Sequence, residues 1–144
     1  MMLKIVLDTN CLMVAAPRRS KYHWFYELLK QGEVKLVVTT DILAEYEEQL
    51  AGFYSPVFAE NVLKTLVNLP ELEEVTVHFK WKLISNDPDD DKFVDAAVAS
   101  NADWLVTHDG DFKVLDTIEF PKVRRITLQA FHQLYFGVPM PNDP

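Results

Sequence analysis

The sequence predicts an α/β fold, a three-layer sandwich built around a mainly parallel sheet. Strand-like apolar runs alternate with helix-like segments along the chain, which is the order that parallel sheets require. The first run, Leu3 to Leu7, is nearly continuous in apolar side chains, as in a strand that is buried on both faces. Right-handed crossovers between such strands would bring several strand ends to one edge of the sheet.

The first half of the chain continues this alternation. Helices are indicated by apolar side chains at three- and four-residue spacing, with Thr40 or Asp41 as the cap of one helix and Pro56 at the start of another. A second apolar run indicates the next strand. The expected ranges are helices over 22–30, 41–50 and 57–67 and a strand over 34–39.

The second half predicts three further strands and two helices. Alternating apolar and polar residues indicate a short, half-exposed strand over 75–79. The stretch 86–112 contains an acid-rich helix entry, an Ala/Val helical pattern and a buried strand that leads into more acids. The expected ranges of the last elements are strands over 104–106 and 123–126 and a closing helix over 127–136, with Leu128, Phe131 and Leu134 facing the core.

Length and composition bound the class of protein. The 144 residues, 49% of them hydrophobic and 25% charged, suit a single soluble domain, which we expect over residues 1–136 with a flexible, proline-rich tail at 137–144. No apolar run is long enough to cross a bilayer, no signal-peptide pattern begins the chain, and a lone cysteine allows no intrachain disulfide. We therefore expect a cytoplasmic protein with no membrane partner.

The formal net charge of −8 argues against broad, nonspecific binding of nucleic acid. The objection weakens if several of the acids form a metal site, because bound divalent ions reverse the local field. The charge therefore disfavours a phosphate-bearing substrate without excluding one.

Acidic side chains follow two of the predicted strands and occur near the start of two helices. Asp8 follows the first strand, and Asp109 and Asp111 follow the strand over 104–106. Glu45 lies one turn into its helix, at the border of the apolar stripe. Because the carboxyl ends of parallel strands share one edge of a sheet, we expect these acids to meet there.

Three consecutive acids, Asp89, Asp90 and Asp91, precede the Ala/Val helix. Most acids in this position cap the helix. If one of them is functional, Asp91 is the best choice, because it begins the apolar pattern and shares a helix face with Asp95. Each acid also has an ordinary interpretation as a cap, a turn residue or part of a solvated surface.

The acids together favour a metal site. Unpaired carboxylates packed together raise one another's pKa, and hard divalent cations such as Mg²⁺ or Mn²⁺ relieve the repulsion and prefer oxygen ligands. The sequence has no Cys/His set with zinc spacing, no glycine-rich phosphate loop and no serine-nucleophile motif. Thr9 and Asn10 either orient Asp8 or satisfy the local backbone.

In the order and spacing of these motifs, the chain resembles the PIN domain, in particular the toxin-type PIN proteins of bacteria and archaea. The likeness extends to about Phe136 and is carried by Leu-Asp8-Thr-Asn10, Glu45 in an early helix, Asp91 before an Ala-rich helix, and Leu-Val-Thr107-His-Asp109. The resemblance implies a Mg²⁺- or Mn²⁺-dependent endoribonuclease for single-stranded RNA that acts as the toxin of a toxin–antitoxin pair. It also implies a small antitoxin protein as partner and a homodimer, for which exposed apolar residues on the helices at 22–30 and 56–67 could provide the surface.

The resemblance also assigns site residues by position. The catalytic, metal-binding set falls on Asp8, Glu45, Asp91 and Asp109, with Asn10 and Thr107 in support and Asp95 and Asp111 as further candidate ligands. Asp95 matches an acid that only some branches carry, and either Asp109 or Asp111 could be the last ligand.

The mechanism that we hypothesise is phosphodiester hydrolysis with one or two ions, about 4 Å apart if there are two. One ion would lower the pKa of the attacking water and the other would stabilise the leaving oxygen. Arg18, Arg19 and Lys21 are the predicted substrate-binding residues, with Tyr22 or Trp24 available to stack on an unpaired base. A solvated turn and core packing are the ordinary alternatives for these residues.

Three rival functions remain open from the residues alone. A catalytically weak metal-binding α/β module that acts through a protein partner would use the same acids. A phosphoacceptor domain of the receiver type would need paired acids directly after the first strand, where Asp8 is single. A DNA nuclease of the flap type would need additional helices to hold duplex ends.

Overall fold

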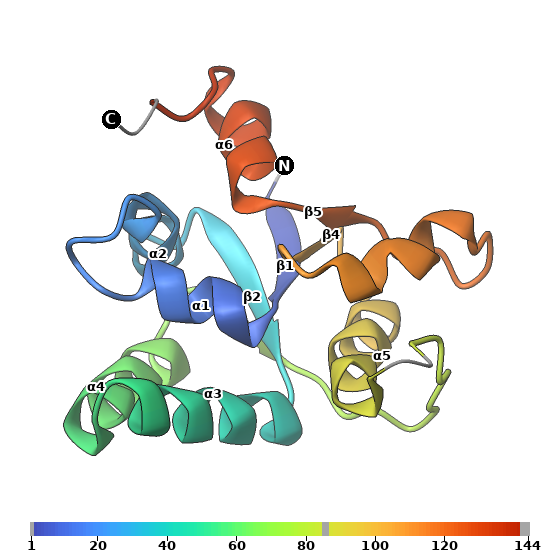
Figure 1. Ribbon diagram of the computed structural model, residues 1–144, viewed down its shortest axis with the longest axis horizontal. Coiled ribbons are helices and arrows are strands. Elements are labelled where there is room, and N and C mark those ends of the chain that lie inside the picture. The colour runs from blue at the N-terminus through green and yellow to red at the C-terminus, as the bar shows by residue number, and fades with distance from the viewer. Residues whose placement is uncertain (1, 85–86, 142–144) are drawn as a thin grey trace.

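The computed structural model describes residues 2–84 and 87–141. A five-stranded sheet with the strand order β3-β2-β1-β4-β5 forms the middle layer, and each strand runs parallel to its neighbours (Figure 1). This confirms the predicted α/β sandwich around a parallel sheet. The strands are β1 Leu3–Leu7, β2 Val34–Val38, β3 Leu72–Glu74, β4 Trp104–Val106 and β5 Arg125–Ile126.

Helices cover both faces of the sheet. Since the strand order runs outward from β1 in both directions, right-handed crossovers place α1 to α4 on one face and α5 with η2 on the other. The last helix, α6, returns to the first face, where Phe131 packs edge-on against Phe25 of α2 with ring centroids 5.2 Å apart. The helices are α1 Thr9–Ala15, α2 His23–Lys30, α3 Thr40–Phe53, α4 Pro56–Val67, α5 Asp91–Ser100 and α6 Leu128–Phe136, with 3₁₀ helices η1 Pro88–Asp90 and η2 Gly110–Thr117.

The two central strands are the most deeply buried. Ile5 to Leu7 of β1 and Leu36 to Val38 of β2 have no exposed surface, as expected for parallel strands that helices cover on both faces. Among the described residues, none of the helices combines the length and the apolar character that a membrane crossing needs.

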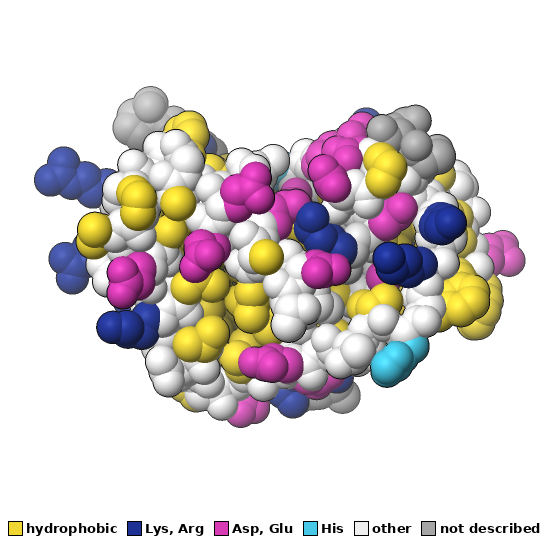
Figure 2. Space-filling view, turned by 90° about the horizontal axis from the view of Figure 1, so that it is seen from below, with side chains coloured by type: hydrophobic (Ala, Val, Ile, Leu, Met, Phe, Trp, Pro, Cys, Tyr) yellow, Lys and Arg dark blue, Asp and Glu magenta, His cyan; other side chains and the backbone are white. Residues whose placement is uncertain are grey.

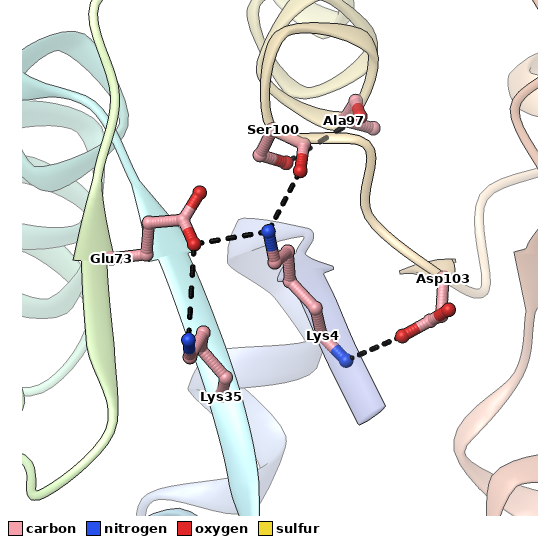
Figure 3. Close-up of polar contacts among 6 residues, drawn as sticks. All are labelled: Lys4, Lys35, Glu73, Ala97, Ser100 and Asp103. Carbon is pink, nitrogen blue, oxygen red and sulfur yellow. Dashed lines mark hydrogen bonds and ion pairs between the residues drawn. The ribbon is translucent and has the colours of Figure 1, made fainter. Parts of the chain in front are cut away.

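A charged network fixes the carboxyl end of α5 to the amino-terminal part of the sheet (Figure 3). The Lys4 ammonium donates to the Ser100 carbonyl oxygen (2.8 Å) and pairs with Glu73 of β3 (3.0 Å), while the Lys4 backbone N–H donates to Asp103 (2.8 Å). A cation is favourable there because the last carbonyls of a helix are unpaired and carry partial negative charge. The opposite end of α5, at Asp91, therefore lies at the carboxyl edge of the sheet.

Several predicted boundaries are wrong. The cap of α3 is Thr39, whose hydroxyl accepts from the Ile42 N–H (3.1 Å), and the helix continues past Leu50 to Phe53. The strand predicted over 75–79 is also wrong, because the residues that pair with β2 are Leu72–Glu74. Val75 and Val77 are half-buried, but Phe79 is 63% exposed, so the alternation in burial does not extend to the end of the segment.

The carboxyl-terminal elements differ from the prediction in smaller ways. Leu134 was expected to face the core, but it lies on the outer side of α6 and is 49% exposed. The 3₁₀ helix η2 was not predicted. Asn86, at the start of the acid-rich stretch, and positions 142–144 of the predicted tail lie outside the described residues.

Candidate active site

Asp8 is a buried acid at the carboxyl edge of the sheet. Thr107, which follows the adjacent strand β4, donates a hydrogen bond to Asp8 Oδ2 (2.8 Å), and the Asp109 backbone N–H donates to the same Thr107 hydroxyl (3.0 Å). Burial raises the pKa of Asp8 to about 6, the charges of Asp109 and Glu45 add to the rise, and the Thr107 hydrogen bond opposes it. Thr107 therefore fixes the orientation of the Asp8 carboxylate.

Glu45 reaches the same edge from α3. The Thr9 hydroxyl donates to one of its carboxylate oxygens, and the ammonium of Lys92 on α5 lies 2.5 Å from the other. Both oxygens of Glu45 thus have a protein partner. The Thr9 hydroxyl contacts Glu45, while a hydrogen bond from the Thr9 backbone lowers the pKa of Asp8. The side chain of Asn10 is exposed on the first turn of α1.

Asp90 is a buried acid that the sequence patterns did not single out. It is 8% exposed, and its Oδ2 is buried without a hydrogen-bond partner. Burial, together with the negative charges of Asp87, Asp109, Asp8 and Asp111, raises its pKa to about 7. Carboxylate oxygens of Asp87, Asp90 and Asp111 lie within 4.8 Å of one another.

Asp91 and Asp95 share a helix face, as predicted, but that face lies against a neighbouring segment. The Asp91 carboxylate accepts the Ile84 N–H (2.9 Å), and the Asp95 carboxylate accepts the Trp81 N–H (3.0 Å). Consecutive helical residues are about 100° apart, so Asp90 and Asp91 face different surroundings. The charge of Asp8 acts on Asp90 and adds to the rise in its pKa.

The sequence did contain a signal for Asp90. It lies three, four and seven positions before Phe93, Val94 and Ala97, which are all buried, so it continues the apolar stripe of α5 by one turn. An acid at a position that periodicity assigns to the core is a stronger functional candidate than an acid at the border of the helix. Asp87, which helps to form the 3₁₀ turn η1, carries no comparable signal.

Asp109 and Asp111 both lie at this edge. The Asp109 carboxylate caps η2 by accepting the Asp111 N–H (2.9 Å). Asp109 is half-buried, whereas Asp111 is exposed but directs its carboxylate toward Asp87 and Asp90. We call the whole set the acidic cluster; its members are Asp8, Glu45, Asp87, Asp90, Asp109 and Asp111.

The acidic cluster fits a hard divalent cation. Every potential ligand is a carboxylate oxygen, and a buried oxygen without a partner, such as Asp90 Oδ2, is costly unless a cation or a donor satisfies it. Burial first, and then the charges of neighbouring acids, raise the pKa values of Asp8 and Asp90, so their ionised forms are unfavourable without a cation. In the view of Figure 2, acidic side chains gather in the upper middle of the surface.

A cleft of about 920 Å³ adjoins the acidic cluster. It lies between α3, the segment that follows β3 and the start of α5. Glu45 belongs both to the acidic cluster and to the wall of the cleft, and Lys80, Lys82 and Lys92 also line it. Lysines are therefore closer to the acids here than in the loop that the sequence suggested for binding substrate.

That predicted basic loop lies elsewhere. Arg18, Arg19 and Lys21 follow the far end of α1, whose seven residues separate them from Asp8 by roughly 10 Å of helix (Figure 1). Trp24 packs against aromatic rings of α6 instead of facing the acids. Lys21 lies over the Tyr22 ring (5.3 Å to its centroid), and Tyr22 packs against His108, the neighbour of Asp109, with ring centroids 5.6 Å apart.

The fold and the site together define a class: a parallel α/β domain with carboxylates gathered at the carboxyl edge of its sheet. The family model of the PIN domain matches residues 4–111, and the chain belongs to this family. No curated protein sequence matches the chain.

Solved structures share the fold. VapBC2 from Rickettsia felis, bound to a DNA fragment from its promoter, superposes with a TM-score of 0.60 at 19% identity, covering 87% of this chain and 98% of that one. DNA-bound VapBC from Salmonella typhimurium gives a TM-score of 0.53 at 16% identity, covering 88% and 99%. VapBC-1 from nontypeable Haemophilus influenzae gives 0.58 at 16%, covering 88% and 98%.

Proposed function

We propose that the protein is a Mg²⁺- or Mn²⁺-dependent endoribonuclease that hydrolyses single-stranded RNA. The observation that carries the proposal is the meeting of the acidic cluster at one sheet edge, with Asp90 Oδ2 buried and unpaired. Membership of the PIN domain family supports the same class of activity.

Within this proposal, Asp8 and Asp90 are the central metal ligands, and Glu45, Asp109 and either Asp87 or Asp111 complete the set. Asp90 takes the role that the family resemblance assigned to Asp91. A divalent ion held there supplies a Lewis acid that lowers the pKa of water and neutralises charge on the phosphodiester. Thr107 and Thr9 hold the carboxylates of Asp8 and Glu45 in place.

The test is RNA cleavage with Mn²⁺ by the wild type and by three isosteric variants. Asp8→Asn and Asp90→Asn are expected to lower the cleavage rate by about 100-fold or more, because each removes a ligand of the ion. Asp91→Asn retains the acidic cluster and is expected to cleave within about threefold of the wild type once folding is matched. Cleavage by Asp8→Asn at the wild-type rate, or no cleavage by the wild type, contradicts the proposal.

The biological role that we infer is that of a cytoplasmic toxin restrained by a small antitoxin protein. The support is the resemblance to toxin-type PIN proteins and the fold shared with VapBC structures. Growth arrest on expression of the wild type, absent for Asp90→Asn, is the expected result. Normal growth with the wild type at a confirmed expression level would argue for the alternative, a catalytically weak metal-binding module.

A homodimer is part of the same proposal. Of the two helices considered for its surface, α2 buries most of its apolar residues, whereas α4 exposes Val57 (68%) and Val67 (49%) and lies next to the exposed Phe53 (71%). The end of α3 and α4 therefore form the better surface. A monomeric mass in sedimentation at micromolar concentration would contradict the dimer.

A further inference from the structure

We propose that a ledge beside the cleft binds single-stranded nucleic acid and directs it toward the acidic cluster. The ledge consists of Phe79, Lys80, Trp81, Lys82 and Phe120, and we call it the aromatic–lysine ledge. The inference rests on the proposed function and extends it, because it names the surface that holds the substrate outside the acids.

The ledge places rings and ammonium groups on different sides of one short segment. Phe79 and Trp81 meet with ring centroids 4.6 Å apart, and Trp81 meets Phe120 at 6.0 Å. Lys80 and Lys82 instead line the cleft, which Phe79 and Trp81 do not. Alternate residues of an extended chain point in opposite directions, which accounts for the opposite sides taken by Lys80 and its two aromatic neighbours. Lys82 has a left-handed backbone (φ 55°), which ends the extended run.

The rings are more exposed than core aromatics. Phe120 is 83% exposed and Phe79 is 63% exposed, while Trp81 between them is half-buried. Adjacent exposed rings of this size are unusual on a soluble surface and often mark a binding site. Trp81 supports the two outer rings, whose faces are open to a ligand.

Two carboxylates of α5 hold the ledge in place. Asp95 accepts the Trp81 N–H (3.0 Å), and Asp91, one helical turn nearer the start of α5, accepts the Ile84 N–H (2.9 Å). Asp90, which directly precedes the same helix, belongs to the acidic cluster. Asp91 and Asp95 are therefore positioning residues, and α5 fixes the ledge relative to the proposed catalytic acids.

Single-stranded nucleic acid is the occupant that these groups fit. Aromatic rings stack on unpaired bases of any sequence, and nearby lysines contact the phosphates. Figure 2 shows Lys or Arg side chains and a hydrophobic patch together at the right of the surface, beside the acids of the middle. The acids in the cleft wall oppose an anionic strand, but divalent ions at the acidic cluster reduce that opposition. Paired bases offer no free faces, so a duplex fits poorly.

The test is the binding of a fluorescein-labelled 12-nucleotide oligouridylate, followed by anisotropy in Ca²⁺, a hard ion that fills carboxylate sites and is a weaker Lewis acid than Mn²⁺. Electrophoresis of the probe after the measurement shows that it is still intact. The pairs Lys80→Ala/Lys82→Ala and Phe79→Ala/Phe120→Ala are expected to weaken binding about tenfold or more. The lysine pair also lowers the slope of log affinity against log salt by about 1.4, since each single-strand phosphate contact contributes about 0.7. All four side chains are exposed, and circular dichroism confirms that the variants fold.

The matched control is Arg18→Ala/Arg19→Ala, which removes the same charge from exposed residues at the far end of α1. It is expected to bind within about twofold of the wild type. The proposal is overturned if the control loses as much affinity as the lysine pair, if both ledge pairs bind as the wild type does, or if a 12-base-pair duplex binds as tightly as the single strand.

Two further outcomes separate this proposal from the proposed function. If the wild type cleaves RNA with Mn²⁺ and the ledge variants keep its KM, the nuclease stands and the ledge is wrong. If the wild type binds single-stranded RNA without cleaving it, and the ledge variants bind it more weakly, the ledge is supported and the nuclease activity is not. If the wild type does not bind single-stranded RNA and the ledge variants instead lose binding to a protein partner, the ledge is not a surface for nucleic acid.

Discussion

Asparagine at position 90 is expected to stabilise the metal-free protein, whereas asparagine at position 91 is expected to destabilise it. The two residues are neighbours of the same type, but their surroundings are opposite. Burial and the charges of nearby acids penalise the ionised form of Asp90. Asp91 accepts a hydrogen bond from the Ile84 N–H, and the neutral amide oxygen of asparagine would accept it more weakly.

The magnitude for Asp90 follows from its pKa, which rises from 3.8 to about 7 on folding. Because the folded value is the higher one, the folded state binds the proton more tightly, so stability is greatest below pH 4 and falls as the pH rises to 7. Three pKa units correspond to about 4 kcal/mol. Solvent screening at the open edge of the site lowers this to about 2 kcal/mol, so Asp90→Asn removes a penalty of roughly 2–4 kcal/mol at pH 8 and almost none at pH 4.

The assay is thermal unfolding in EDTA at pH 4, 6 and 8. For a domain of this length, 1 kcal/mol shifts Tm by about 3–4 °C, so Asp90→Asn is expected to raise Tm by on the order of 10 °C at pH 8. Asp91→Asn replaces a charge-assisted hydrogen bond with a neutral one, which costs about 1 kcal/mol and lowers Tm by about 3–4 °C. The control, Asp89→Asn, changes an exposed neighbour and leaves Tm nearly unchanged.

The reasoning is refuted if Asp90→Asn is neutral or destabilising at pH 8. A higher Tm for Asp91→Asn would show that Asp91 is the acid held among like charges, and the assignment of the acidic cluster would have to be reversed.

Three further predictions concern the same site. Mn²⁺ affinity, measured by calorimetry, is expected to rise from pH 5.5 to 8 with release of protons, because Asp8 and Asp90 must both be ionised to bind the ion; a flat profile would contradict this. Lys92→Met is expected to tighten Mn²⁺ binding by about fivefold or more, because the Lys92 ammonium competes with the ion for Glu45; weaker binding would show that Lys92 supports the site. Thr107→Val is expected to raise the pH midpoint of Mn²⁺ binding and to lower the stability by about 1 kcal/mol, since Asp8 loses its hydrogen-bond donor; an unchanged midpoint would contradict that role.

Local patterns are sufficient to predict most of the fold. The run Leu3 to Leu7 is apolar because β1 lies in the middle of a parallel sheet, and the end of that run correctly predicts the position of Asp8 at a strand end. Asp109 follows β4 in the same way. The strand predicted over 75–79 failed because alternation of apolar and polar residues does not determine which residues pair, and β2 pairs with Leu72–Glu74 instead.

The choice among consecutive acids depends on finer information. Helix phase favours Asp90, through its spacing from Phe93 and Val94. Asp91 is favoured instead by its place at the start of the apolar pattern and by the helix face that it shares with Asp95. The contacts of Asp91 and Asp95 could not be predicted, because they depend on how the chain at 81–84 returns alongside α5. That placement is set by tertiary packing, and no periodic pattern encodes it.

Anomalous scattering from a crystal soaked in Mn²⁺ tests the central assignment most directly. We predict a manganese peak at coordination distance, about 2 Å, from carboxylate oxygens of Asp8 and Asp90, and its loss in Asp90→Asn. A peak bound by Asp91 and Asp95, or a soaked crystal with no peak at the carboxyl edge of the sheet, would contradict the account.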